Sequence, residues 1–125
     1  MTIELELITM KDFPKFMKNK LNKIDQESQF TEDIEGYVFD GKDGSQMAFW
    51  TCKSDRVSKE HTHNFDEYMI VAKGCVTIYI ENKKHVLYPG DEFYIPKGTL
   101  MKVACIAGTR TIHAFEKKRA KRARE

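Results

Sequence analysis

The sequence predicts an all-β fold, an antiparallel barrel or sandwich with a short N-terminal helix. From Tyr37 onward, short apolar or aromatic runs alternate with turn residues. There are seven or eight such runs at spacings of roughly 8 to 12 residues, which is typical of antiparallel β-proteins. Before Tyr37, one stretch instead carries its apolar residues at helical spacing. At 125 residues and 41% hydrophobic content, the chain has room for one packed domain.

The first 36 residues predict a strand and a helix that pack on the barrel. Residues 1–9 alternate apolar and polar side chains, as a short strand does. Residues 11–24 predict an amphipathic helix with Pro14 in its first turn, where proline is tolerated; its apolar positions are Phe13, Phe16, Met17, Leu21 and Ile24. We therefore divide the chain into this N-terminal segment (1–36), a barrel (37–116) and a basic C-terminal tail (117–125).

The barrel strands are predicted from the apolar runs, and the turns from the glycines between them. Gly74, Gly90 and Gly98 each follow a run, where a tight turn often needs a positive φ angle. Phe49 and Trp50 are adjacent, so only one of them can face the interior. The predicted strands are residues 37–39, 47–52, 66–73, 76–81, 85–87, 93–95, 101–106 and 111–115.

The lack of a membrane-spanning run and of a secretory signal predicts a cytoplasmic protein, and the cysteine content agrees with a reducing compartment. No apolar run approaches the roughly 20 residues that cross a bilayer, so we expect no membrane association. The acidic, alternating start is unlike a secretory signal. Three cysteines without a CxxC pair predict free, mostly buried thiols: Cys52, Cys75 and Cys105.

The C-terminal tail carries most of the positive charge. Residues 117–125 hold six basic side chains and one acid, which leaves 15 basic against 18 acidic side chains in the rest of the chain. A short basic tail on an acidic body predicts a solvated end, whose removal should leave stability nearly unchanged. Nucleic-acid binding is not expected, since no basic face or helix-turn-helix pattern accompanies the tail.

The segment that carries chemistry begins with His61-Thr62-His63 and reaches Glu67. Residues two apart on an extended chain leave the same face, so both imidazoles point one way, and Glu67 has the same parity. Two imidazoles and a carboxylate form a nitrogen and oxygen site for a divalent first-row metal. Met69 shares this parity and should line the pocket. Two surface histidines on a strand are the alternative interpretation.

This segment resembles the first motif of the cupin superfamily, G(X)5HXH(X)3-4E(X)6G. The chain has the two histidines, Glu67 and then Gly74, but lacks the leading glycine. The second motif, G(X)5PXG(X)2H(X)3N, is matched by Gly90, Pro96 and Gly98. The resemblance covers roughly the last 90 residues. It implies an antiparallel double-stranded β-helix, the cupin jelly-roll barrel.

The resemblance also implies a fourth ligand, a histidine from the second motif, but Met101 occupies that position and Cys105 that of the asparagine. Three interpretations follow. The three remaining ligands hold iron, zinc, manganese or nickel with open positions; or the Met101 sulfur is a weak ligand for a softer metal; or Met101 plugs a decayed site. His113 is a candidate replacement ligand, or else a hydrogen-bonded strand histidine.

Similar cupins imply an enzyme on a small molecule, of dioxygenase, isomerase or lyase type. Only Glu67, His113 and Tyr79 stand out as general bases, so no reaction type is predicted. The alternative functions are a non-catalytic ligand-binding or sensor barrel and a relic with an empty barrel. We also expect a homodimer, because edge strands and outward apolar residues such as Ile70 need covering.

Overall fold

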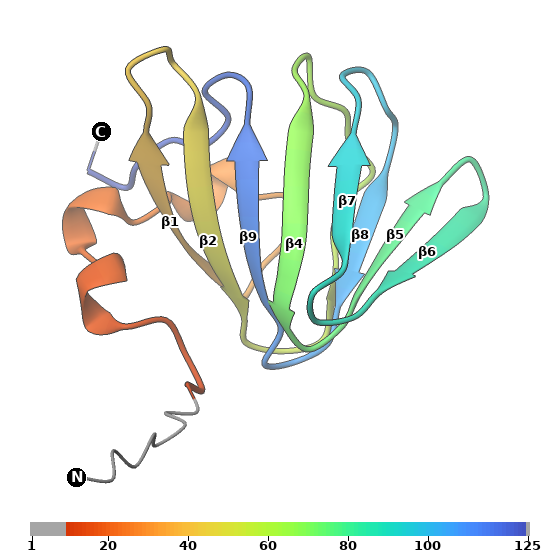
Figure 1. The fold of residues 1–125 in the computed structure, drawn as a ribbon, viewed down its shortest axis with the longest axis horizontal. Coiled ribbons are helices and arrows are strands. Elements are labelled where there is room, and N and C mark those ends of the chain that lie inside the picture. Colours follow the sequence, from red (N-terminus) through yellow and green to blue (C-terminus); the bar gives the residue numbers. More distant parts are fainter. Residues whose placement is uncertain (1–9, 125) are drawn as a thin grey trace, which may run out of the picture.

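The computed structural model describes residues 10–124, and in it two antiparallel sheets enclose the core (Figure 1). The larger sheet has the strand order β1-β2-β9-β4-β7 and the smaller one β3-β8-β5-β6. The strands are β1 (Ile34–Asp40), β2 (Gln46–Cys52), β3 (Arg56–Val57), β4 (Glu67–Lys73), β5 (Val76–Ile80), β6 (Lys83–Leu87), β7 (Glu92–Ile95), β8 (Lys102–Cys105) and β9 (Arg110–Phe115). The all-β prediction is confirmed, and only the two-residue β3 was missed. The strand predicted for residues 1–9 lies outside the described residues.

Side-chain alternation along the strands produces the core. In β4, Glu67, Met69 and Val71 are buried while Tyr68 is exposed. In β2, Trp50 faces inward, whereas Phe49 lies outside with its ring centroid 5.6 Å from that of Phe13. The buried apolar residues form two clusters, one around Trp50 and Phe115 from the larger sheet and one of β4, β5 and their neighbours.

The predicted N-terminal helix is wrong. Residues 11–24 contain short 3-10 turns, η1 (Lys15–Met17) and η2 (Lys20–Asn22), and a third, η3 (Gln26–Ser28), follows them. The Asn19 side chain accepts a hydrogen bond from the Leu21 amide and starts a new turn, with extended backbone on either side. The apolar residues also serve different purposes, because Ile24 is buried in the core while Phe16 is 80% exposed.

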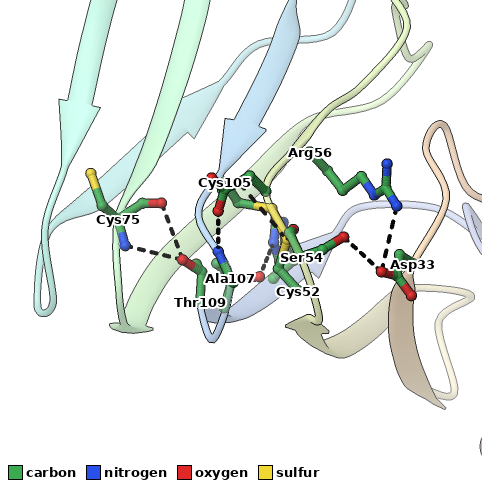
Figure 2. The surroundings of a disulfide bond; sticks show 11 residues. Asp33, Cys52, Ser54, Arg56, Cys75, Cys105, Ala107 and Thr109 are labelled. Atoms are coloured by element: carbon green, nitrogen blue, oxygen red, sulfur yellow. Dashed lines mark hydrogen bonds and ion pairs between the residues drawn. A yellow bond between two sulfur atoms is a disulfide. The ribbon is translucent and has the colours of Figure 1, made fainter.

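Cys52 and Cys105 form a disulfide, so the prediction of free thiols is wrong for these two residues (Figure 2). They end strands β2 and β8 of opposite sheets, and the fold brings their Cα atoms to 6.7 Å although 53 positions separate them in sequence. Such a pairing across sheets leaves no short-range spacing signal. Cys75 remains a free thiol, as predicted.

The C-terminal tail packs against the barrel, contrary to the predicted solvated end. Ala120 is fully buried, and Arg122 is 6% exposed. Arg122 pairs with Asp40 at 2.6 Å and donates a hydrogen bond to the Val38 carbonyl at 3.1 Å. The tail also forms a β-bridge with Ile24, beside the 3-10 turns (Figure 1). The number of charged residues in the tail does not predict that the tail packs against the barrel.

Two smaller findings complete the fold. Gly74, Gly90 and Gly98 all have positive φ angles, as predicted, and a Cβ atom on Gly74 would collide with Thr109. In residues 10–124, no helix is long and apolar enough to span a bilayer.

Candidate ligand and metal site

One cavity of about 110 Å³ lies between the two sheets and is lined by every predicted metal-ligand and pocket residue, whereas Tyr79, a candidate general base, does not line it. Strand β4 contributes Glu67 and Met69, strand β9 contributes His113, and the extended segment before β4 contributes His61 and His63. Met101, just before β8, completes the set. The parity argument had grouped His61, His63, Glu67 and Met69, and the structure adds Met101 and His113 to the same interior space.

Glu67 is the first residue of β4 and is buried, with 6% exposure. Its Oε2 accepts a hydrogen bond of 2.7 Å from Nδ1 of His113. Its Oε1 has no hydrogen-bond partner in the described part of the chain and lies 3.8 Å from Nε2 of His63. Burial by itself would raise the pKa of Glu67, but the hydrogen bond from His113 and the electrostatic effect of its basic neighbours, Arg119 among them, lower it overall. The site thus holds an ionised carboxylate with one unsatisfied oxygen.

His61 is held in a defined tautomer. Its backbone pairs with that of Met101 through hydrogen bonds of 2.8 and 3.0 Å. Its Nδ1 lies 2.7 Å from the Lys59 carbonyl oxygen, which can only accept, so Nδ1 carries the proton and Nε2 keeps a lone pair. The ring stacks on Phe30 at 4.0 Å between centroids. Burial lowers the pKa of His61, which favours this neutral form.

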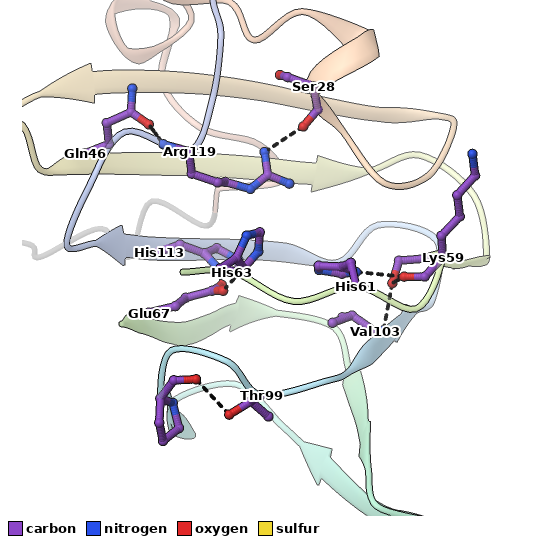
Figure 3. A network of polar contacts seen from close by, with 12 residues as sticks. Ser28, Gln46, Lys59, His61, His63, Glu67, Thr99, Val103, His113 and Arg119 are labelled. Carbon is purple, nitrogen blue, oxygen red and sulfur yellow. Dashed lines mark hydrogen bonds and ion pairs between the residues drawn. The ribbon is translucent and has the colours of Figure 1, made fainter. Parts of the chain in front are cut away.

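His63 lies next to His61, with 5.1 Å between the ring centroids (Figure 3). It stacks on Phe65 and is nearly enclosed, with a side-chain exposure of 9%. Burial lowers the pKa of His63 to about 4, although Glu67 acts in the opposite direction. Both histidines are therefore neutral at pH 7, which is the form that binds metal.

His113 connects Glu67 to Thr111. His113 Nδ1 donates to the Glu67 carboxylate, and His113 Nε2 lies within hydrogen-bond distance of the Thr111 hydroxyl oxygen, at 2.9 Å. Both ring nitrogens are thus engaged, which is the hydrogen-bonded alternative that the sequence left open for this residue. Met69 and Met101 are 1% and 2% exposed and form apolar wall, with Met69 paired to His113 and Met101 paired to His61 on neighbouring backbone.

The ligand types of this site suit a divalent metal, but the ligating side chains are farther apart than metal coordination requires. Two neutral imidazoles and an unsatisfied carboxylate oxygen are ligands that iron, zinc, manganese and nickel accept. Yet within residues 10–124 no group of three His, Cys, Asp or Glu side chains lies close enough to hold an ion. Glu67 lies 3.8 Å from His63 Nε2 and 2.7 Å from Nδ1 of His113, the candidate replacement ligand, and the ring of His61 is 5.1 Å from that of His63 between centroids.

Sequence reasoning missed Arg119, which lines the same cavity from the C-terminal tail (Figure 3). It also missed the disulfide between Cys52 and Cys105, which both form part of the wall. The one local signal for Arg119 is the neighbouring Ala120, a small apolar residue within a basic run.

Two facing antiparallel sheets around a mainly apolar cavity that carries a few polar side chains define a barrel with a ligand-sized site. Residues 48–114 match the family model of the Cupin domain, and this chain belongs to that family. No curated protein matches it.

Solved structures confirm the fold. KdgF from Halomonas sp. is 19% identical, with 77% of this chain and 93% of that chain covered and a TM-score of 0.63. An RmlC-like cupin from Shewanella frigidimarina is 17% identical, with 83% of this chain and 96% of that chain covered and a TM-score of 0.60. A putative ethanolamine utilization protein, EutQ, from Salmonella typhimurium is 18% identical, with 66% of this chain and 68% of that chain covered and a TM-score of 0.59. At these identities the likeness extends to the fold alone.

Proposed function

We propose that this cupin binds a small molecule in its cavity beside a divalent transition metal held by His61, His63 and Glu67. One observation carries the proposal: Oε1 of Glu67 is buried, charged and without a donor, 3.8 Å from His63 Nε2. Leaving such an atom unsatisfied is costly, whereas a cation between the carboxylate and a neutral imidazole would satisfy both.

The surrounding hydrogen bonds support this role. A metal-binding histidine usually donates its second ring N–H to a carbonyl or carboxylate, as His61 does to Lys59. His113 similarly holds the other oxygen of Glu67 and fixes the carboxylate in place. A bound metal would supply a Lewis acid for a ligand oxygen. The chain itself supplies a proton on His113 Nδ1 and apolar walls that limit water.

A second candidate function is a metal-free binding barrel. Its supporting observation is that, among the described residues, no three ligating side chains converge on one point. Met101 stands at the position where the family pattern has a histidine, and its buried side chain narrows the cavity beside His61. In this function the cavity binds its small molecule through polar side chains alone.

Metal analysis separates the two. Wild-type protein is stripped with chelator, dialysed against iron(II), zinc, manganese or nickel, and measured for bound metal and thermal shift. We expect about one equivalent of one metal in the wild type, and affinity losses of at least about tenfold in His63→Ala and Glu67→Gln. His85→Ala is the matched control, because His85 lies on β6 and does not line the cavity.

A variant that adds a possible fourth ligand provides a second test of the metal site. Residue 101 pairs directly with His61 through two backbone hydrogen bonds, so Met101→His adds an imidazole next to the proposed ligands. We expect tighter metal binding in this variant. Less than about a tenth of an equivalent of every metal in the wild type, unchanged in the His63 and Glu67 variants, would rule out the metal site in favour of the metal-free barrel.

A further inference from the structure

The backbone of Arg119 is fixed on the barrel by a buried glutamine. The amides of Arg119 and Ala120 both donate to Oε1 of Gln46, each at 2.8 Å. Gln46 is 1% exposed, at the start of β2. One guanidinium nitrogen, Nη1, donates to the Ser28 carbonyl at 3.0 Å. These bonds hold the guanidinium at the cavity without using its remaining N–H groups.

The guanidinium of Arg119 lies among aromatic rings. Its Cζ atom is 5.0 Å from the ring centroid of Trp50, 5.1 Å from that of Phe30 and 5.7 Å from that of Phe115. Burial lowers its pKa to about 10, with Glu67 acting weakly in the opposite direction. Arg119 therefore stays charged at neutral pH, in surroundings where an ionic hydrogen bond is stronger than in water.

No ion pair in residues 10–124 includes Arg119. Arg122, three residues later, is paired with Asp40 at 2.6 Å. Glu67 is the single acidic residue in the cavity lining of the described chain, and its Oε2 is bound to His113. The cavity thus presents a cation whose charge the barrel does not neutralise by direct contact.

We propose that Arg119 makes this cavity a receptor for a small organic carboxylate. A planar guanidinium matches a carboxylate through two parallel N–H···O bonds. The aromatic rings around it suit a ligand with an apolar or planar remainder, and about 110 Å³ limits that remainder to a few atoms. A phosphate usually meets several cations or backbone amides, whereas this cavity offers one guanidinium.

The inference rests on the proposed function in one respect: it takes the cavity to be the ligand site. It does not need the metal. The cavity lining holds one arginine and one carboxylate, so a divalent cation at Glu67 would add positive charge beside Arg119 and favour an anion further. Carboxylate binding and metal binding are therefore separable, and each should strengthen the other.

The test compares carboxylates with their neutral amides. Propionate, butyrate and benzoate are titrated against propionamide, butyramide and benzamide by calorimetry and by NMR of the Arg119 Nε–Hε signal. We expect the best carboxylate to bind roughly 10- to 100-fold tighter than its amide and to shift that signal in the wild type. Arg119→Gln should abolish the preference and Arg119→Lys should reduce it. Lys117→Gln, which removes an exposed charge from the same tail, should preserve it.

Three results would overturn the inference: equal binding of carboxylate and amide by the wild type, an undiminished preference in Arg119→Gln, or tighter binding of inorganic phosphate than of any carboxylate. The NMR shift needs no variant, so the proposal is decided even if Arg119→Gln does not fold. Repeating the titration with His63→Ala in chelator separates the proposals. A retained preference without metal supports Arg119 independently, while metal binding without a preference supports the metal site alone.

Discussion

Deleting residues 117–125 should destabilise the barrel by about 3 to 5 kcal/mol, because the tail satisfies buried polar groups. Without it, Oε1 of Gln46 loses both amide donors in a position that is 1% exposed. Water can replace these donors once the tail is gone, so each lost hydrogen bond costs a net of about 0.5 to 1.5 kcal/mol. The Val38 carbonyl loses its bond from Arg122, about 1 kcal/mol more, and Ala120 no longer covers the core. The ion pair of Arg122 adds little, since the Asp40 side chain is 47% exposed.

Urea denaturation of the deletion variant against the wild type measures this loss. A domain of this size should also melt roughly 10 to 20 °C lower. Lys117→Ala is the control, because Lys117 is exposed and should change stability by less than about 0.5 kcal/mol. A deletion that costs less than about 1 kcal/mol would mean that the tail is a solvated end after all.

Two further predictions concern the disulfide and the buried histidines. Thiol titration of the unfolded, unreduced chain should detect Cys75 alone, and three reactive thiols before reduction would contradict the disulfide. Reduction should release Cys52 and Cys105 and destabilise the fold by about 4 kcal/mol, given the 53-residue separation. Because the pKa of His63 is lowered to about 4 in the folded state, the unfolded chain binds its proton first and stability falls as pH drops from about 6.5 towards 4. In chelator, the free energy of unfolding should be about 2 kcal/mol lower at pH 5 than at pH 7 because of this residue. If the free energy of unfolding of His63→Phe depended on pH as steeply as that of the wild type, the prediction would be contradicted.

The sequence predicts most of the barrel because strand patterns are local. Runs such as β4 alternate buried and exposed side chains with a period of two, and glycines such as Gly74 mark turns that need a positive φ angle. The N-terminal prediction failed because apolar spacing alone does not require a single helix. Asn19 and Asp25 each cap a short turn and divide the segment, and Phe13 and Ile24 then pack at separate places on the barrel.

The site was predictable only where its residues share a motif. His61, His63 and Glu67 are close in sequence, so strand parity was enough to bring them to one cavity. Arg119 and the Cys52–Cys105 bond depend on contacts between distant segments, which no spacing reveals. For His113, the sequence allowed a metal ligand or a hydrogen-bonded strand histidine. Only the fold shows that its two ring nitrogens contact Glu67 and Thr111.

The charges inside the cavity argue against an empty relic of a binding barrel. Glu67 is buried and ionised with one oxygen unsatisfied, and Arg119 lies among aromatic rings without an ion pair in residues 10–124. The unsatisfied oxygen of Glu67 costs free energy in the empty protein, and an apolar side chain of similar volume would pack there at lower cost. A cation beside Glu67 would remove this cost, and a carboxylate would pair with the charge of Arg119. The same pair of ligands would attract each other across the cavity, so the two proposed sites form one binding unit.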